Sequence, residues 1–127
     1  MNGILYVALG GALGASGRYA LGHVMFKLMG PGYPWGTLVA NVLGGLAMGL
    51  LVGWLAFRVS GGEHLRLFLA VGVLGGFTTF SSFSLEALRM IETKAYGTAA
   101  GYISASVIFS IFAVFLGLII ARKVFAT

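Results

Sequence analysis

Long apolar stretches, separated by short polar or glycine-containing connections, run through the whole chain. A helix needs about 20 mostly apolar residues to cross roughly 30 Å of bilayer hydrocarbon. Four stretches meet that length and predict spans at about residues 3–29, 35–57, 64–91 and 97–121. The sequence therefore predicts an all-α integral membrane protein in which residues 1–127 form one four-span domain. Because the connections are short, consecutive spans are expected to be antiparallel neighbours.

The second predicted span carries a small or polar residue at every fourth position. Thr37, Asn41, Gly45, Gly49 and Gly53 therefore lie along one face of the helix. The glycines predict close helix packing, which small residues allow in a membrane. The Asn41 amide needs a partner, because an unpaired amide in hydrocarbon costs several kcal/mol. That partner is either a ligand or a neighbouring helix.

The fourth predicted span repeats hydroxyl side chains at the same spacing. Thr98, Tyr102, Ser106 and Ser110 are each four residues apart, so their hydroxyl groups stack on one face over about three turns. Such a face could form one side of a polar pathway. Hydroxyl groups in helices often bond back to their own backbone carbonyls, so ordinary packing remains the alternative.

The third predicted span contains the strongest local feature, the sequence GGFTTFSSFS at residues 75–84. Two glycines followed by a run of hydroxyl residues do not favour a continuous helix, and we predict a helix break at mid-membrane depth. Non-helical backbone is tolerated there only if protein or a cavity surrounds it. The break would free carbonyls for a cation and amides for an anion. Phe80 and Phe83 share a face after the break, either packed together or with ring edges turned toward an anion.

Charged side chains inside the predicted spans are few. Arg18 lies far from both ends of the first span, where a charge should face the bundle interior or water, although a purely structural arginine is an alternative. Glu86 lies near the end of the third span, three residues before Arg89. This spacing predicts a local ion pair, and a vestibule lined by Glu86 is the alternative.

The composition narrows the chemistry. Hydrophobic residues make up 59% of the chain and charged residues 9%, and the absence of cysteine excludes disulfides and thiolate metal sites. The three acidic residues, Glu63, Glu86 and Glu92, form no catalytic set, so we predict neither an enzyme nor an organic cofactor. The net charge of +5 is dispersed over loops and helix ends, which argues against nucleic acid and favours lipid headgroups. Hydroxyls, an amide, ring edges and one arginine favour transport of a small anion.

The basic residues do not mark one side of the membrane as cytoplasmic. One predicted side carries Arg58, Arg66, Arg122 and Lys123, and the other carries Lys27, Arg89 and Lys94. This near balance permits insertion in both orientations and an antiparallel dimer, whereas a fixed topology set by one or two loops is the alternative. Four spans are also few to enclose an ion pathway, so an oligomer, most simply a twofold dimer, is expected.

Three segments also resemble a known family. GGFTTFSSFSLE at residues 75–86, GTLVAN at residues 36–41 and the pair Gly17–Arg18 are similar to the Fluc (CrcB) family of fluoride channels. The resemblance covers nearly the whole chain. It implies a fluoride-selective channel in the bacterial inner (plasma) membrane, built as an antiparallel dual-topology homodimer with two pores and a structural sodium ion at its centre. It also implies passive export, in which fluoride that entered as HF leaves down its electrochemical gradient.

The resemblance carries roles to single residues of this chain. Phe80 and Phe83 correspond to the pore phenylalanines, and Asn41 corresponds to the pore amide. Gly75 and Thr78 match the positions whose backbone carbonyls hold the sodium ion. The other residues assigned to the fluoride pathway are Ser81, Ser82, Tyr102, Ser106, Ser110, Thr37, Glu86 and Arg18. The family often has threonine at the position of Ser82, and because the hydroxyl is retained, only tuning of the pathway is expected.

Two other functions suit a small four-span protein. Small dual-topology multidrug exporters carry an acidic residue in the first span, whereas this chain has Arg18 and no acid there. A non-transporting membrane assembly protein would account for the small size and the glycines, but it gives no reason for a helix break or for hydroxyl-bearing faces. The sequence favours the fluoride channel over both.

Overall fold

The structure, a computed structural model, describes residues 2–126, and every regular element in that range is helical. The elements are α1 (Asn2–Met29), α2 (Trp35–Arg58), α3 (Glu63–Arg66), the π-helical segment η1 (Leu67–Leu74), α4 (Gly75–Phe77), α5 (Phe80–Glu92) and α6 (Tyr96–Phe125). Four helical runs are long and apolar enough to cross a membrane, namely Gly3–Met29, Trp35–Arg58, Glu63–Glu92 and Tyr96–Phe125. The prediction of an all-α protein with four such helices is confirmed. The last helix extends beyond the predicted end near residue 121.

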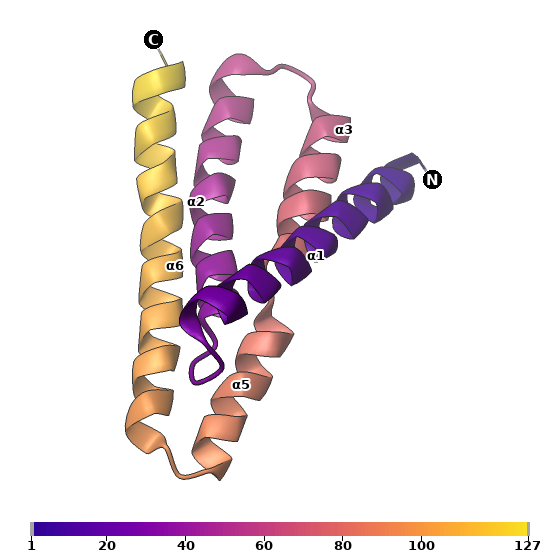
Figure 1. Cartoon of the computed structure of the whole chain (residues 1–127). Coiled ribbons are helices and arrows are strands. Elements are labelled where there is room, and N and C mark those ends of the chain that lie inside the picture. Colours follow the sequence, from indigo (N-terminus) through magenta and orange to yellow (C-terminus); the bar gives the residue numbers. More distant parts are fainter. Residues whose placement is uncertain (1, 127) are drawn as a thin grey trace.

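The closest helix packing joins runs that are not consecutive in sequence (Figure 1). α2 and α6 lie side by side along most of their length, and α1 crosses the run from α3 to α4 obliquely. Gly10 and Gly14 lie at that crossing, where an added Cβ would collide with the carbonyl oxygens of Phe68 and Val73. Consecutive helices also touch, as their short connections require. Small residues, however, decide which helices approach most closely.

Small residues lie between the helices and large apolar residues lie outside. The buried residues of α2 are Ala40, Gly44, Gly45, Gly49 and Gly53. A Cβ on Gly49 would collide with the carbonyl oxygen of Val114 and would lie 3.0 Å from the Cα of Gly117 in α6. The outer face of α6 includes three rings that are each 57% exposed, those of Phe109, Phe112 and Phe115. This distribution suits lipid, where close packing holds helices together, and it confirms the packing role predicted for the α2 glycines.

Two glycines with left-handed backbone follow the first two long helices. Gly30 has a φ of +83°, and its N–H donates to the carbonyl oxygen of Phe26 at 2.9 Å, which closes the last turn of α1. Gly61, in the connection between α2 and α3, has a φ of +67°. Other residues adopt this conformation at a cost of roughly 1–2 kcal/mol, so glycine allows both turns to stay short.

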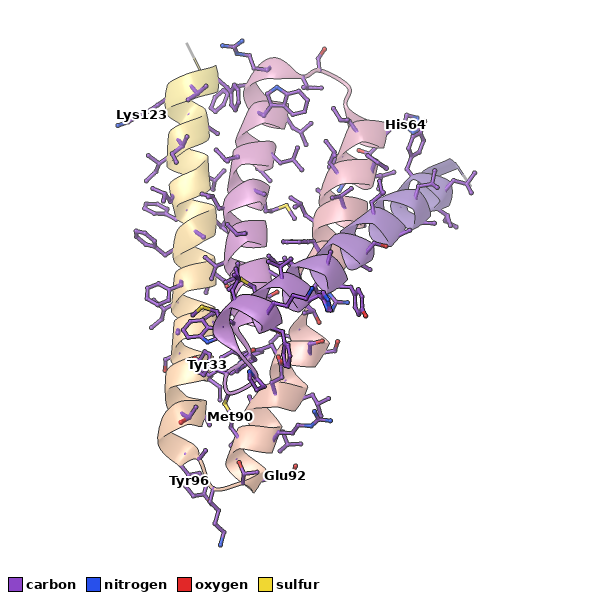
Figure 2. All side chains as sticks on the ribbon, in the orientation of Figure 1. Tyr33, His64, Met90, Glu92, Tyr96 and Lys123 are labelled. Carbon is purple, nitrogen blue, oxygen red and sulfur yellow. The ribbon has the colours of Figure 1, made fainter. Side chains whose placement is uncertain are left out.

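Both ends of the described chain lie at the end of the bundle that also carries the α2–α3 connection. Arg58 Nε donates a hydrogen bond of 2.7 Å to the carbonyl oxygen of Phe125 at the end of α6. The ring centroids of Tyr6 in α1 and His64 in α3 are 4.7 Å apart. Figure 2 shows His64 at this end and Tyr96 at the opposite end. This end of the bundle also carries the four basic residues predicted to lie together on one side of the membrane, namely Arg58, Arg66, Arg122 and Lys123.

Candidate functional site

Two threonines interrupt the helical run between α4 and α5. α4 ends at Phe77, and α5 begins at Phe80. Between them, Thr78 and Thr79 have extended backbones, with φ/ψ values of −84°/156° and −150°/122°. Both residues are β-branched, which lowers helix propensity and favours extended backbone. Two extended residues span only about 7 Å, so the last carbonyls of α4 lie near the first amides of α5.

Asn41 of α2 binds the backbone at this interruption through both polar atoms of its amide. The Thr79 N–H donates to Asn41 Oδ1 at 2.8 Å, and Asn41 Nδ2 donates to the Thr79 carbonyl oxygen at 3.1 Å. In a continuous α-helix the Thr79 N–H would bond to the carbonyl of Gly75, four residues earlier. The Asn41 amide takes the place of that carbonyl. Of the two partners considered for Asn41, the structure therefore supplies the neighbouring helix.

Thr79 also caps the start of α5. Its Oγ1 accepts a hydrogen bond of 3.1 Å from the Ser82 N–H and lies 3.2 Å from Ser81 Oγ. This arrangement satisfies one of the N–H groups that a helix N-terminus leaves free. It also draws the Ser82 N–H away from the carbonyl of Thr78, four residues earlier. Within residues 2–126, the carbonyls of Gly75 and Thr78 thus both lack their helical donors.

A groove of about 440 Å³ lies beside the interruption, between α2, α5 and α6. Six of the predicted pathway or cation-site residues line it, namely Asn41, Thr78, Phe80, Phe83, Ser106 and Ser110. They come from three of the four predicted spans. Part of the polar face predicted on the second span and part of the hydroxyl-bearing face predicted on the fourth therefore meet in one groove.

The two phenylalanines have different environments in this groove. Phe83 is only 8% exposed, whereas Phe80 is 78% exposed. Their ring centroids are 5.5 Å apart, with the planes tilted by 50°. The Phe83 ring also lies 5.4 Å from the ring of Tyr102. Phe83 is thus fixed in the wall of the groove, while Phe80 faces the outside of the helix bundle.

Ser106 contributes a buried hydroxyl to the groove. The residue is 5% exposed, and its Oγ has no hydrogen-bond partner within residues 2–126. Burial of a hydroxyl without a partner costs about 1–3 kcal/mol in proteins. Ser110, one turn further along α6, is half-buried and lines the same groove. The wall of the groove therefore contains a buried hydroxyl that has no protein partner within residues 2–126.

A second cavity, of about 360 Å³, adjoins the connection between α1 and α2. Its lining includes Tyr33, Thr37, Glu86 and Arg89. The hydroxyl of the fully buried Tyr102 donates to Glu86 Oε1 at 3.1 Å. The prediction of an ion pair between Glu86 and Arg89 is wrong, since the described residues include no such pair. The buried hydroxyl on α6 draws the carboxylate inward instead.

The remaining predicted site residues line neither of these two spaces. Tyr102 is buried between them, in contact with the wall of each. Ser81 is exposed and Ser82 is half-buried in the first turn of α5, and Gly75 is exposed in α4. Arg18 is half-buried on α1, and its buried Nε has no hydrogen-bond partner in the described part of the chain.

Thr79 is the site residue that the sequence analysis missed. One signal was present, because a threonine three residues before Ser82 at a predicted break is a typical helix N-cap. No signal in the sequence indicated the hydrogen bonds between the Thr79 backbone and Asn41. The two residues are 38 positions apart, and no periodicity along one helix relates them.

Sequence comparisons identify the family to which this chain belongs. The family model described as "CrcB-like protein, Camphor Resistance (CrcB)" matches residues 5–118. The chain is a member of the CrcB family. With its four helices able to span a membrane, this CrcB chain is a multi-pass membrane protein.

Similar proteins in this family carry the name "Fluoride-specific ion channel FluC". The protein of that name from Caulobacter vibrioides is 55% identical over 127 residues, which cover 99% of this chain and 100% of the relative. Those from Phenylobacterium zucineum and Hyphomonas neptunium are 53% and 52% identical, with the same coverage. The CrcB family is thus one of ion channels and not of enzymes.

Proposed function

We propose that this chain is the subunit of a fluoride-selective channel and that fluoride moves along the groove between α2, α5 and α6. The groove itself carries the proposal. It brings together the amide of Asn41, the rings of Phe80 and Phe83 and the unpartnered hydroxyl of Ser106. An amide N–H, a hydroxyl and the positive edge of an aromatic ring all attract a small anion. The names of the relatives support fluoride as that anion.

The pathway continues from the groove toward the cavity that Glu86 lines. Along α6 the hydroxyls of Ser110, Ser106 and Tyr102 follow one another at four-residue intervals, and Tyr102 reaches Glu86. The serine hydroxyls replace part of the water that a fluoride ion gives up when it leaves solution, whereas the single proton of the Tyr102 hydroxyl already goes to Glu86. The remaining residues assigned to this pathway are Thr37, Ser81, Ser82 and Arg18. The start of α5 adds the positive end of a helix dipole.

The interruption between α4 and α5 is proposed to lie at mid-membrane depth and to bind a structural sodium ion. Gly75 and Thr78 supply backbone carbonyls that have lost their helical donors to Asn41 and to the Thr79 hydroxyl. Carbonyls of unwound helices are the ligands that sodium takes in membrane proteins, so the residues present fit this ion. Two carbonyls from one chain are few for a cation, which suits a site shared with a second copy.

The working unit is proposed to be an antiparallel homodimer in the bacterial inner membrane. Phe80 is 78% exposed beside the groove, and a second copy in the opposite orientation would cover it. The near balance of basic residues between the two ends of the bundle supports insertion both ways. Each subunit then contributes one groove, which gives two pores. Fluoride leaves the cytoplasm through them passively, down its electrochemical gradient.

The rival functions account for less of the site. A proton-coupled multidrug exporter would need an acidic residue in α1, and the acidic residues of this chain are Glu63, Glu86 and Glu92. An assembly protein without transport would gain nothing from an unpartnered hydroxyl inside a groove, because that hydroxyl weakens the fold.

Flux measurements on purified protein in liposomes test the proposal. Vesicles loaded with potassium fluoride and potassium chloride receive valinomycin to balance charge, and ion-selective electrodes follow both anions. We expect rapid fluoride efflux while chloride is retained, and neither anion should leave protein-free vesicles. Comparable efflux of both anions, or none of fluoride, would refute the channel assignment.

A further inference from the structure

We infer that Asn41 is a positioning residue for the helix interruption, and that its amide keeps the Gly75 carbonyl free by holding the Thr79 N–H. The inference rests on the sodium site proposed above and extends it. A residue assigned to the fluoride pathway would also set the affinity of the cation site, although its side chain makes no contact with the cation.

Two acceptors are available to the Thr79 N–H. In a continuous helix it bonds to the carbonyl of Gly75, and in this structure it bonds to Asn41 Oδ1 at 2.8 Å. The second bond, from Asn41 Nδ2 to the Thr79 carbonyl at 3.1 Å, fixes the same peptide from the other direction. If the amide is removed, the N–H of Thr79 regains the Gly75 carbonyl as its nearest alternative, and a cation ligand is lost.

Few side chains can form both of these hydrogen bonds to the Thr79 backbone. A primary amide presents a donor and an acceptor side by side, in the same geometry as a peptide group. Aspartate keeps the acceptor but places a second oxygen against the Thr79 carbonyl. Serine has one polar atom, and glutamine is longer by one methylene. Asparagine at position 41 is thus matched to the two bonds observed.

The packing around Gly44 provides an independent reason for the short distance between α2 and the interruption. Gly44 follows Asn41 by almost one turn and is buried. A Cβ at this position would collide with Thr78 Cγ2 and would lie 3.5 Å from Phe77 Cδ2. The bare glycine therefore lets α2 approach closely enough for both amide bonds to form.

Sodium titrations of thermal stability test the inference without any measurement of flux. The purified channel is unfolded in detergent, free of fluoride, with sodium chloride exchanged for choline chloride at constant ionic strength. A ligand that binds only the folded state raises the Tm, and the dependence on concentration gives the half-saturating sodium. For Asn41→Ala, which removes both hydrogen bonds, we expect this concentration to rise about tenfold. Asn41→Asp keeps the acceptor for the Thr79 N–H, so it should raise this concentration less than Asn41→Ala does. Leu43→Ala, at a 47% exposed position of the same helix, should leave it within about twofold.

Replacement of the Thr79 amide by an ester separates positioning from general damage. An α-hydroxy analogue of threonine at position 79 removes the N–H, so nothing can recapture the Gly75 carbonyl. It also turns the Thr78 carbonyl into an ester carbonyl, which is a weaker ligand, so the comparison is made within the ester background. There Asn41→Ala should change the half-saturating sodium by about twofold or less, against about tenfold in the unmodified backbone.

Two results would overturn the inference. They are unchanged sodium affinity in the folded Asn41→Ala variant, and a loss of affinity on Asn41→Ala in the ester background that equals the loss in the unmodified backbone. A wild-type protein whose Tm ignores sodium would instead remove the proposed sodium site, and the inference with it. Fluoride flux in liposomes would still decide the channel proposal separately.

Discussion

Substitution of Ser106 by alanine should change stability and conduction in opposite directions. The Ser106 Oγ is buried and unpartnered within residues 2–126, and an unsatisfied hydroxyl costs about 1–3 kcal/mol. Alanine is also the better helix former, by up to about 0.5 kcal/mol. The small void left by one oxygen cancels a similar amount. Polar contacts between membrane helices contribute free energies at the low end of these ranges. We therefore expect the free energy of unfolding to rise by about 1 kcal/mol.

Conduction should fall in the same variant, because the hydroxyl is a proposed ligand of fluoride. Reversible unfolding in mixed micelles measures the stability, and electrode-monitored efflux from liposomes measures conduction. Ser104→Ala provides the matched control, because Ser104 is exposed on the same helix. It should change the free energy of unfolding by about 0.5 kcal/mol or less and leave efflux unchanged.

Two outcomes would contradict this reasoning about Ser106. A loss of about 1 kcal/mol or more in Ser106→Ala would mean that the hydroxyl has a stabilising partner in the assembled protein. Efflux equal to that of the unmodified protein would mean that fluoride does not use this hydroxyl. Either result would reassign Ser106 to structure or to neutral packing.

Three further changes test the packing, the second cavity and the topology. Gly49→Ala places a Cβ against the backbone of α6 and should destabilise the protein by about 1–3 kcal/mol. Gly101→Ala is the control, because a Cβ there has no atom within 4 Å, and it should stabilise the protein by about 0.5–1 kcal/mol. Equal effects of the two substitutions in unfolding assays would contradict the tight α2–α6 contact. Tyr102→Phe removes the 3.1 Å bond to Glu86 and should cost about 1.5 kcal/mol while it slows fluoride efflux, and unchanged efflux would exclude this pair from the pathway. Ser60→Cys, at an exposed position in the α2–α3 connection of a chain without cysteine, should react with impermeant maleimide from both sides of the membrane. Labelling from one side only would exclude dual insertion.

The spans were predictable because they depend on properties that each segment carries by itself. Apolar length decides whether a helix can cross a bilayer, and all four predicted spans correspond to helices of the structure. The glycines of α2 were equally readable, since the four-residue spacing that puts Gly45, Gly49 and Gly53 on one face is a property of a single helix. They pack against α6. The sequence could not state which helix they would meet.

Predictions about pairs of side chains were less secure when the partner lay on another helix. Glu86 was expected to pair with Arg89, because spacing within one helix was the only relation visible. In the structure its carboxylate accepts a hydrogen bond of 3.1 Å from the Tyr102 hydroxyl, on α6. A buried hydroxyl with few other partners competes well for a carboxylate, whereas an exposed arginine three residues away has water as an alternative. Only the packing of α5 on α6 decides between them.

Asn41 shows what the sequence determined and what the tertiary structure decided. Its sequence context required that a buried amide find a partner, since hydrocarbon offers none, but it left a ligand and a neighbouring helix equally open. The tertiary structure selected the backbone of Thr79, 38 residues away, with bonds of 2.8 and 3.1 Å. The sequence by itself thus determined the solvent of this protein, the number of its spans and the polar groups that must be satisfied. The approach of α2 to the helix interruption, which the bare Gly44 permits, decided how they are satisfied, because hydrogen bonds form over about 3 Å and such distances exist only after the helices have packed.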